Sequence, residues 1–519
     1  MNDVVKRVII VGGGSAGWLT AGVIAAEHHA ASSSGLEVTV LESPDVGSIG
    51  VGEGTWPTMR DTLRRIGVSE TDFIRECDAS FKQGSKFVGW VTGGRDDYYY
   101  HPFVLPHGYS ETNLVSAWQS RHPATPFADL VSFQPHVCEQ GRAPKQITTP
   151  EFAAVANYSY HLDAGKFGQF LQKHCTEKLG VRHLLDHVVG VNSSDCGDIA
   201  SLSTKAHGEV EGELFIDCTG LASLLLGKHF GVPFVGARHI LCNDAALALQ
   251  VPYADENSPI ASQTISTAQS AGWIWDIGLP TRRGIGYVYS TAHVSDERAE
   301  AELRAYVERT AGPLAARAGS PRRLSISPGH REKFWHRNCV AVGMSAGFIE
   351  PLEASALALV EFSAAMISDG MPATREAMDI AARRFNDAFG YRWGRIIDFL
   401  KLHYVLSKRT NDDFWIDMRR AETIPERLRE LLALWRHQPP SRYDFHRVEE
   451  IFPSASYQYV LYGMGFRPET GHTTRTSWDP DRAERFFSET AELTRRMLSG
   501  LPTNRELIGQ IAGHRMQRI

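Results

Sequence analysis

The chain has 519 residues, and its 54 lysines and arginines against 60 aspartates and glutamates give a formal net charge of −6. The basic residues are dispersed, which excludes an electrostatic footprint for nucleic acid, and no apolar stretch is long enough to span a bilayer. We therefore expect a protein that acts on a small molecule and has neither a nucleic-acid nor a membrane partner.

No linker, charge run or fixed-period repeat divides the chain, so we expect one interwoven catalytic unit with a helical appendage. The seven cysteines are scattered without C-x-x-C spacing, which argues for reduced thiols. The first residues run directly into an apolar stretch and leave no room for a signal peptide. These features predict a cytoplasmic protein.

The first predicted elements are a strand at 8–11, a glycine turn and a helix at 19–27. Gly12, Gly14 and Gly17 have the spacing G-x-G-x-x-G. Without a Cβ, Gly12 permits the turn, Gly14 lets a pyrophosphate approach the backbone, and Gly17 lets the helix pack on the strand. The phosphates would then lie at the positive end of the helix, which predicts a dinucleotide site.

A second strand, at 38–41, ends at Glu42, where a carboxylate meets the ribose hydroxyls of a dinucleotide. The alternative to a dinucleotide site is a glycine turn in another α/β fold, and such a turn does not predict a carboxylate at this position. Residues 47–55 are too rich in glycine for a regular element, and Thr55 is the predicted N-cap of a helix that ends at Ile66. Two glycine loops favour contact with a flavin over an ordinary surface loop.

Residues 79–90 alternate into a strand, with Lys82 between apolar neighbours at its start. By pattern alone a lysine is a solvated surface residue. The aromatic cluster at 97–103 surrounds His101 and is compatible with either a packed core or a pocket wall for a flat apolar ligand. The sequence does not separate these two alternatives.

The next segments again alternate between helix and strand. Asp163 caps an amphipathic helix at 164–179, and strands follow at 181–185 and 188–191. An apolar strand at 213–220 ends in Asp-x-x-Gly, which resembles the turn beside the cofactor in many two-motif flavoproteins. This order predicts an α/β fold.

Residues 245–290 have a period near two, and Trp273 and Trp275 lie on one face of a strand. Spacing alone favours a packed aromatic core for this pair. Residues 338–347 repeat the pattern of strand and glycine turn, and a long apolar helix begins within 348–357, with Glu353 in its first turn. Since helix N-termini bind anions, this position is a candidate anion site.

Helical periodicity covers 374–407 and continues from 423 to the C-terminus, with breaks at 438–440 and 463–465. The aromatic stretch at 451–463 faces either core or pocket. The last hundred or so residues therefore form a predicted helical subdomain.

In these residues the chain resembles the flavin-dependent tryptophan halogenases over nearly its whole length. The shared motifs, each weak alone but specific in their order, are the Gly12–Gly17 loop, Gly52-Glu53-Gly54-Thr55, Phe81-Lys82, Tyr100-His101-Pro102-Phe103, Trp273-Ile274-Trp275, Pro351-Leu352-Glu353 and the stretch 457–465. One small departure is Gly278, where the family's W-x-W-x-I-P signature has proline.

The resemblance implies an α/β fold with an FAD-binding, Rossmann-like module of the two-motif flavoprotein type, an inserted β-sheet region and a C-terminal helical subdomain. The implied boundaries are a halogenase module at 1–405, with a flavin core at about 1–95, 155–230 and 325–405 and β insertions at about 96–154 and 231–324, and a helical subdomain at 406–519.

The resemblance also implies the chemistry. Reduced FAD and O2 would oxidise chloride or bromide, held near Ser355 and Ala356, to hypohalous acid. Lys82 would hold this acid by a hydrogen bond or as a haloamine beside an indole ring. Glu353 would assist delivery of the halogen and take the proton from the arene. Because hypohalous acid is indiscriminate, a pocket must fix the arene near one donor.

The remaining implied roles concern the cofactor, the substrate and the partners. The expected FAD-binding residues are Gly12, Gly14, Ser15, Ala16, Gly17, Glu42, Glu53, Gly54, Val188, Met344 and Leu357. The expected substrate pocket contains His101, Phe103, Phe452 and Tyr457, and the Trp273 and Trp275 motif would separate the flavin chamber from the substrate. No metal site is expected. A separate flavin reductase would supply reduced FAD to a monomer or homodimer.

Departures from the family leave the substrate open. Ala354 and Ala356 replace a serine and a glycine of the usual P-L-E-S-T-G, which would weaken chloride binding and favour bromide. Arg447 falls near an acid that holds free tryptophan in the family, so indole or a substituted indole is an equal candidate.

Two other classes share the first motif. A flavin-dependent aromatic hydroxylase (monooxygenase) is the principal alternative, but its second flavin strand usually ends in Gly-Asp, whereas Gly343 is followed by Met344 here. A non-catalytic flavoprotein would have no reason to keep Lys82, Glu353 and Trp273 together.

Overall fold

The computed structural model describes residues 4–47, 52–94, 96–317, 319–445, 447, 450–469 and 479–518. The chain divides into two compact units, each assembled from three stretches of sequence. Unit 1 contains Met1–Ala79, Leu162–Ala237 and Ser327–Trp393, and unit 2 contains Ser80–His161, Arg238–Ile326 and Gly394–Ile519.

Unit 1 is built on a six-stranded sheet whose central strand is β1 (Arg7–Val11). Neighbouring strands pair in parallel, apart from the short antiparallel β20 at one edge. The order across the sheet is β20 (Trp335–His336), β21 (Cys339–Ala341), β12 (Leu214–Asp217), β1, β2 (Glu37–Glu42) and β8 (Arg182–Leu185). Most of β1 and all of β12 are buried, as parallel strands covered on both faces must be. This confirms the Rossmann-like α/β fold.

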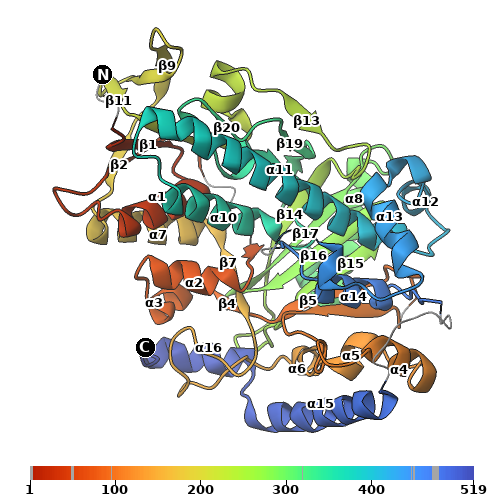
Figure 1. Ribbon diagram of the computed structural model, residues 1–519. Helices are drawn as coiled ribbons and strands as arrows, with labels where there is room; N and C mark the ends of the chain where they lie inside the picture. Colours follow the sequence, from red (N-terminus) through yellow and green to blue (C-terminus); the bar gives the residue numbers. More distant parts are fainter. Residues whose placement is uncertain are drawn as a thin grey trace. The chain divides into compact units, whose positions relative to one another are not determined.

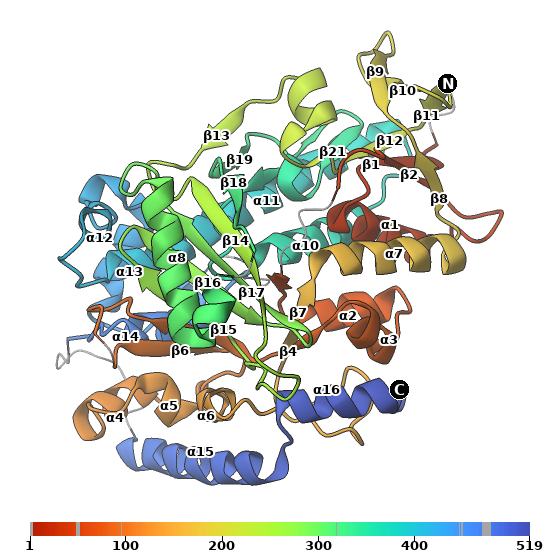
Figure 2. The same ribbon diagram turned by 180° about the vertical axis from the view of Figure 1, so that it is seen from behind.

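Three helices of unit 1 lie side by side in both views (Figures 1 and 2): α1 (Ser15–Glu27), α10 (Ser355–Asp369) and α7 (Ala164–Lys178). The segment from Gly17 to Ala25 of α1 is wholly buried, because this helix is apolar on all sides. Asp163 caps α7 as predicted, since its carboxylate accepts hydrogen bonds from the backbone N–H groups of Gly165 and Lys166.

The smaller elements of unit 1 lie around this core. They are α2 (Thr58–Arg65), α3 (Glu70–Glu76), the strand β3 (Gly52–Gly54), the antiparallel sheet of β9 (Val188–Ser193), β10 (Ile199–Thr204) and β11 (Glu209–Glu211), the sheet of β13 (Phe234–Gly236), β19 (Gly329–Arg331) and β22 (Gly347–Phe348), and the short helices η1 (Gly220–Ala222), η2 (Leu224–His229) and η3 (Gly343–Ser345).

Unit 2 is built on a seven-stranded sheet, which contains one parallel pair, β15 with β5. Its order is β18 (Arg322–Ser325), β14 (Ala245–Pro252), β17 (Arg282–Tyr289), β16 (Gly272–Gly278), β15 (Thr264–Gln269), β5 (Gly84–Val88) and β6 (Tyr98–Pro102). Helix α8 (Asp296–Ala311) lies across β14 and β17 (Figure 2). The strand period predicted for 245–290 is confirmed.

The helices of unit 2 include α4 (Leu114–Arg121), α5 (Phe127–Val131) and α6 (Gln134–Glu139), which pack along α15 (Pro480–Gly500) in both views (Figures 1 and 2). The others are α9 (Pro313–Ala316), α12 (Asp413–Asp417), η4 (Ala421–Thr423), α13 (Glu426–Trp435), η5 (Arg442–Asp444), α14 (Ser454–Gly463) and α16 (Asn504–Gly513). Helix α11 (Arg375–Val405) begins in unit 1 and ends in unit 2. Among the described helices, none has the length and apolarity needed to cross a bilayer.

Several predicted details differ from the structure. Thr55 is not an N-cap, because α2 begins at Thr58 after Pro57. Of the glycine-dense segment 47–55, residues 48–51 lie outside the described residues, and Gly52–Gly54 form the short strand β3. The segment 96–154 contains one strand and three helices, so it is not a β insertion. Unit 2 groups this segment and 238–326 with the C-terminal helices. The predicted boundary at 405 separates a halogenase module from a helical subdomain by function, and it stays a prediction.

Candidate functional site

The glycine loop of unit 1 has the geometry that a bound pyrophosphate requires. Gly12 has φ +116°, and a Cβ on it would lie 2.2 Å from the carbonyl oxygen of Cys218. A Cβ on Gly17 would lie 1.9 Å from the carbonyl oxygen of Gly12, so the helix can approach the strand this closely only with glycine there. Among the described atoms, apart from those of Gly14 and its two chain neighbours, none lies within 4 Å of a Cβ built on Gly14. The backbone at Gly14 is therefore open to a ligand, and these residues fit a dinucleotide.

Glu42 lies against this loop. A Cβ on Gly13 would lie 2.0 Å from the carboxyl carbon of Glu42, and Oε2 of Glu42 lies 2.9 Å from Nε2 of His183. The loop is fastened at its other end by Ser15, whose hydroxyl donates to the carbonyl of Ala164 at 3.3 Å. The structure thus brings Glu42 to the glycine loop, and its contact with a ribose stays a prediction.

The other predicted FAD-binding residues also lie in unit 1. Ala16 lies in the first turn of α1. A Cβ built on Gly343 would lie 2.9 Å from the Cβ of Ala16. Burial raises the pKa of Glu53 to about 7. The remaining positions are Gly54 at the end of β3, Val188 at the start of β9, Met344 in η3 and Leu357 in the first turn of α10.

The catalytic candidate Glu353 precedes α10 and does not lie in its first turn, which corrects the sequence prediction. The helix begins at Ser355, and the residue before it, Ala354, adopts a left-handed conformation with φ +55° and ψ +38°. A turn closed by a hydrogen bond from the N–H of Ala354 to the carbonyl of Pro351, at 3.0 Å, leads into this conformation. The chain reverses here, so Glu353 lies outside the helix while Ser355 and Ala356 form its first turn.

Lys82 lies in unit 2 at the end of β4 (Ser80–Lys82) and is only 1% exposed. It is therefore not the solvated lysine that its pattern alone indicated. Its Nζ lies 5.4 Å from the centre of the Phe103 ring. A buried ammonium over an aromatic face is uncommon and marks a candidate functional group.

The strand that pairs with β4 brings a histidine to the face of Lys82. In the antiparallel pairing of β4 with β7 (Ser159–Asp163), Ser80 is opposite His161 and Lys82 is opposite Ser159, so all four side chains share one face. Burial, and secondarily the charge of Lys82, lower the pKa of His161 well below its usual range. His161 is therefore neutral at pH 7, with Nε2 2.8 Å from the hydroxyl of Thr264.

Three of the four predicted pocket residues surround Phe399 of α11. Phe452 stacks on Phe399 with 3.8 Å between ring centroids, Tyr457 meets it edge-on at 4.9 Å, and His101 lies 5.7 Å away. The Nε2 of His101 also lies 2.9 Å from the hydroxyl of Ser456. The structure therefore brings His101, Phe452 and Tyr457 into one aromatic cluster in unit 2.

Both tryptophans of the central motif are buried in β16. Trp273 is 0% exposed and Trp275 is 8% exposed. The ring of Trp275 covers Gly286 of the paired strand, where a Cβ would lie 2.1 Å from it. Packing accounts for their burial, and the predicted separation of two chambers stays a prediction.

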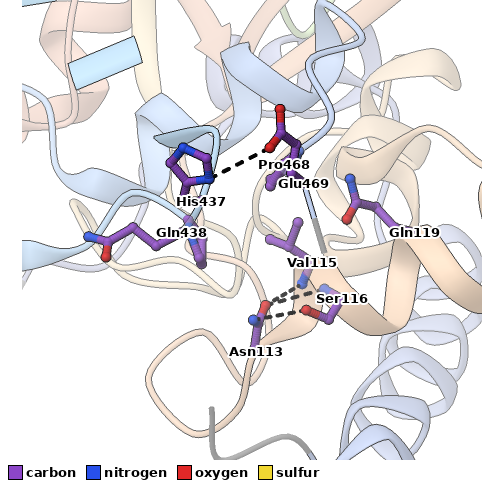
Figure 3. Close-up of a pocket in the computed structure, with 9 residues that line it drawn as sticks. Asn113, Val115, Ser116, Gln119, His437, Gln438, Pro468 and Glu469 are labelled. Carbon is purple, nitrogen blue, oxygen red and sulfur yellow. Dashed lines mark hydrogen bonds and ion pairs between the residues drawn. The ribbon is translucent and has the colours of Figure 1, made fainter. Parts of the chain in front are cut away.

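A small surface pocket of unit 2 contains none of the predicted residues. It is lined by residues from the start of α4, from the segment after α13 and from the segment after α14. His437 and Glu469 form an exposed ion pair there at 3.7 Å (Figure 3). Asn113 is one of the lining residues and caps α4 by accepting from the backbone N–H groups of Val115 and Ser116 (Figure 3). Within the described part of the chain, no group of three or more His, Cys, Asp or Glu side chains could hold a metal ion.

Sequence reasoning missed three residues that hold the predicted groups. Asn504, the first residue of α16, donates to the carbonyl of Phe81 at 3.0 Å and so holds the strand that carries Lys82. Phe399 is the centre of the aromatic cluster, and Trp56 donates its indole N–H to the carbonyl of Glu353 at 2.6 Å. These links join segments that are distant in sequence, so the local pattern could not predict them. The one local sign was the pair Trp56-Pro57 directly after the second glycine loop, which marks the start of a helix but not the bond to Glu353.

Comparison with known proteins identifies the family. The profile of the family described as tryptophan halogenase matches residues 7–479. The 7-chloro-L-tryptophan 6-halogenase KtzR of Kutzneria sp. (strain 744) is 31% identical, and the match covers 97% of this chain and 99% of that protein.

Two solved structures extend this result. The tryptophan halogenase of Shewanella frigidimarina NCIMB 400 is 50% identical with a TM-score of 0.96, and all of both chains is covered. Tar14, a tryptophan C-6 flavin-dependent halogenase from taromycin biosynthesis, is 33% identical with a TM-score of 0.90 over 98% of this chain and 100% of that chain. Nothing in these matches supports the hydroxylase alternative. The chain belongs to the tryptophan halogenase family and is an enzyme of the flavin-dependent halogenase class.

Proposed function

We propose that the protein halogenates an electron-rich arene regioselectively, the substrate being indole, tryptophan or an indole derivative. In the balanced reaction the arene, a halide ion, a proton, O2 and FADH2 give the aryl halide, oxidised FAD and two molecules of water. The observation that carries this proposal is the buried Lys82 beside Phe103 in a member of this family.

FAD is the cofactor of this reaction: when bound in its reduced form, it supplies, with the halide, the electrons that convert O2 into hypohalous acid and water. The open backbone at Gly14 supports phosphate binding at the start of α1, beside Ser15, Ala16 and Gly17. We assign Glu42 to the ribose hydroxyls, and assign Glu53, Gly54, Val188, Met344 and Leu357 to the remainder of the cofactor. The N–H groups at Ser355 and Ala356 would hold the halide at the start of α10.

Lys82 controls the hypohalous acid in this proposal. Either the ammonium Nζ donates a hydrogen bond to the acid, or the neutral amine takes the halogen as an N–X bond and releases water. Transfer of the halogen to the arene then returns the original amine. The burial of Lys82 supports either route, because it shields a reactive halogen donor from water.

Glu353 takes the proton that the arene loses when the carbon–halogen bond has formed. A carboxylate suits this step, since it accepts a proton and opposes the positive charge that develops on the ring. Lys82 and Glu353 lie in different units of the chain. We propose that they act together because the chain belongs to the tryptophan halogenase family, whose profile spans both residues.

The aromatic cluster of His101, Phe452 and Tyr457, together with Phe103, is our candidate for the arene pocket. The relatives named above act on tryptophan or 7-chlorotryptophan according to their names. Arg447 would repel the ammonium of a free amino acid, so we propose that indole is used better than L-tryptophan. We also propose that bromide is preferred to chloride, because Ala356 gives a small anion less access to the backbone.

We further propose that a separate flavin reductase supplies the reduced FAD, that the enzyme works as a monomer or homodimer, and that it acts in the cytoplasm. All seven cysteines are free thiols, which supports a reducing compartment.

The test is mass spectrometry of a panel of indoles incubated with the protein, FAD, a flavin reductase, NADH and either bromide or chloride. We expect a product whose mass changes with the halide supplied. A product of constant mass that carries one added oxygen would support the hydroxylase instead, and the absence of any product across the panel would contradict the proposed function.

A further inference from the structure

Two loops of unit 1 that are far apart in sequence meet at Trp56. This residue follows by two positions the segment Gly52–Gly54, here called the flavin loop. Its indole N–H donates to the main-chain carbonyl of Glu353 over 2.6 Å. Trp56 is 9% exposed and Glu353 is 5% exposed, so water has little access to this bond. A hydrogen bond in such an environment is stronger than one in water, and its loss leaves a carbonyl in need of a partner.

The loop that receives this bond, residues 351–354, is here called the catalytic loop and needs external support. Ala354 has φ +55°, a conformation that an alanine adopts only when its surroundings hold it there. The turn from Pro351 to Ala354 is one such constraint. Trp56 supplies another, on the peptide carbonyl that directly precedes the strained residue. The orientation of this peptide sets where the Glu353 side chain leaves the backbone and where the N–H groups of Ser355 and Ala356 point.

Trp56 is itself fixed to the same helix that the loop begins. Its ring meets Phe362 of α10 edge-on, with 6.2 Å between ring centroids. In the first turns of α2, which begins two residues after Trp56, the hydroxyls of Thr58 and Thr62 donate to the buried carboxyl of Glu361, at 3.2 and 2.6 Å. The chain around Trp56 is thus fastened to α10 at two points, Phe362 and Glu361, and the indole N–H adds a third link, to the catalytic loop that precedes α10.

We propose that Trp56 is a positioning residue for halogenation: its indole N–H fixes the Glu353 peptide and thereby sets the geometry of both the proton-accepting carboxylate and the halide-binding N–H groups. The functional half of this inference rests on the proposed roles of Glu353, Ser355 and Ala356. The structural half, that Trp56 holds the loop in its strained form, does not depend on them.

The test compares Trp56→Phe, which keeps an aromatic ring and removes the N–H, with the matched control Trp335→Phe. Trp335 is 2% exposed, its indole N–H donates to the carbonyl of Arg337 at 3.0 Å, and its ring meets Phe385 edge-on at 5.7 Å. The control therefore loses the same kind of bond in the same unit without touching the catalytic loop. Benzothienylalanine at position 56, which replaces only the N–H with sulfur, serves if the phenylalanine variant does not fold.

The first readout is hydrogen exchange of the apoprotein, measured by mass spectrometry on peptides that cover 351–360. We expect Trp56→Phe to accelerate exchange there about tenfold, the factor that one hydrogen bond is worth, with no change in Trp335→Phe. The second readout is turnover: the KM for bromide should rise about tenfold and kcat should fall, while the FAD dissociation constant stays within about twofold of the wild type.

Unchanged exchange at 351–360 in both position-56 variants would overturn the inference. So would a variant whose FAD dissociation constant rises while its bromide KM, measured at saturating FAD, stays at the wild-type value, because Trp56 would then serve the flavin loop alone. If the wild-type protein halogenates nothing, the proposed function fails, and the exchange measurement on the apoprotein still decides whether Trp56 holds the loop.

Discussion

The buried carboxyl of Glu361 makes the stability of unit 1 depend on pH. Glu361 is 3% exposed, and desolvation raises its pKa from 4.5 to about 8, although the hydroxyls of Thr62 and Thr58 act in the opposite direction. Since the folded-state pKa lies above the unfolded value, the protonated carboxyl stabilises the fold fully below about pH 4.5, and this stabilisation declines as the pH rises through 8.

The magnitude follows from the difference between the folded-state pKa of about 8 and the ordinary value of 4.5. At about 1.4 kcal/mol per unit this amounts to at most about 5 kcal/mol of unfolding free energy lost between pH 4.5 and pH 8. Glu361→Gln keeps the shape and cannot ionise, so the variant should match the wild type near pH 5 and exceed its stability near pH 9 by several kcal/mol.

Urea-induced unfolding at the two pH values measures this difference. Glu376→Gln, at an exposed carboxyl in the first turn of α11, is the control and should change the unfolding free energy equally at both pH values. An equal effect of Glu361→Gln at pH 5 and pH 9 would refute the reasoning, because it would mean that Glu361 ionises in the folded protein as it does in the unfolded chain.

Three further outcomes are expected. Glu353→Gln should lower kcat for halogenation about a hundredfold or more with FAD affinity unchanged, and an unaltered single-turnover rate would exclude the proton-accepting role. Indole should give a higher kcat/KM than L-tryptophan, and bromide a higher one than chloride, in competition assays with a common supply of reduced flavin; if tryptophan with chloride is fastest, the inferences from Arg447 and Ala356 are both wrong. Asn504→Ala should cost about 1–3 kcal/mol of stability in thermal unfolding and reduce halogenation, because it removes the support of the strand that carries Lys82; full activity in the folded variant would show that this support is dispensable.

The sequence was most informative where one short segment carries the whole physical constraint. The loop from Gly12 to Gly17 is an example, since strand, turn and helix are contiguous, and both the φ of +116° at Gly12 and the close approach of Gly17 to the Gly12 carbonyl arise within the loop itself. The N-cap Asp163 is another, because capping involves a residue and the backbone of the next turn. Periodicity likewise predicted the long helix α11 to within two residues at each end.

Features that depend on distant partners could not be predicted in the same way. The burial of Lys82 follows from strand pairing with β7 and from the support of Asn504, neither of which the local pattern contains. The start of α10 was placed too early, because the left-handed conformation of Ala354 is imposed by its surroundings and alanine gives no sign of it. The segment 96–154 was placed in a β insertion on the family resemblance alone, whereas the three helices that follow its one strand pack on α15, a partner more than 300 residues away in sequence.

The central claim is that Lys82 delivers the halogen, and the most direct measurement compares Lys82→Met with Lys145→Met. Lys145 is 0% exposed and also lies over aromatic rings, that of Tyr158 at 5.2 Å and that of Phe81 at 5.9 Å. Because Phe81 precedes Lys82 in β4, its side chain points to the other face of the strand, so Lys145→Met removes a buried ammonium on the face opposite to Lys82. Halogenated indole per molecule of folded enzyme should fall about a thousandfold in Lys82→Met while FAD affinity and peroxide formation from O2 persist, and Lys145→Met should keep its activity. Regiospecific product formed by Lys82→Met at the wild-type rate would contradict the account.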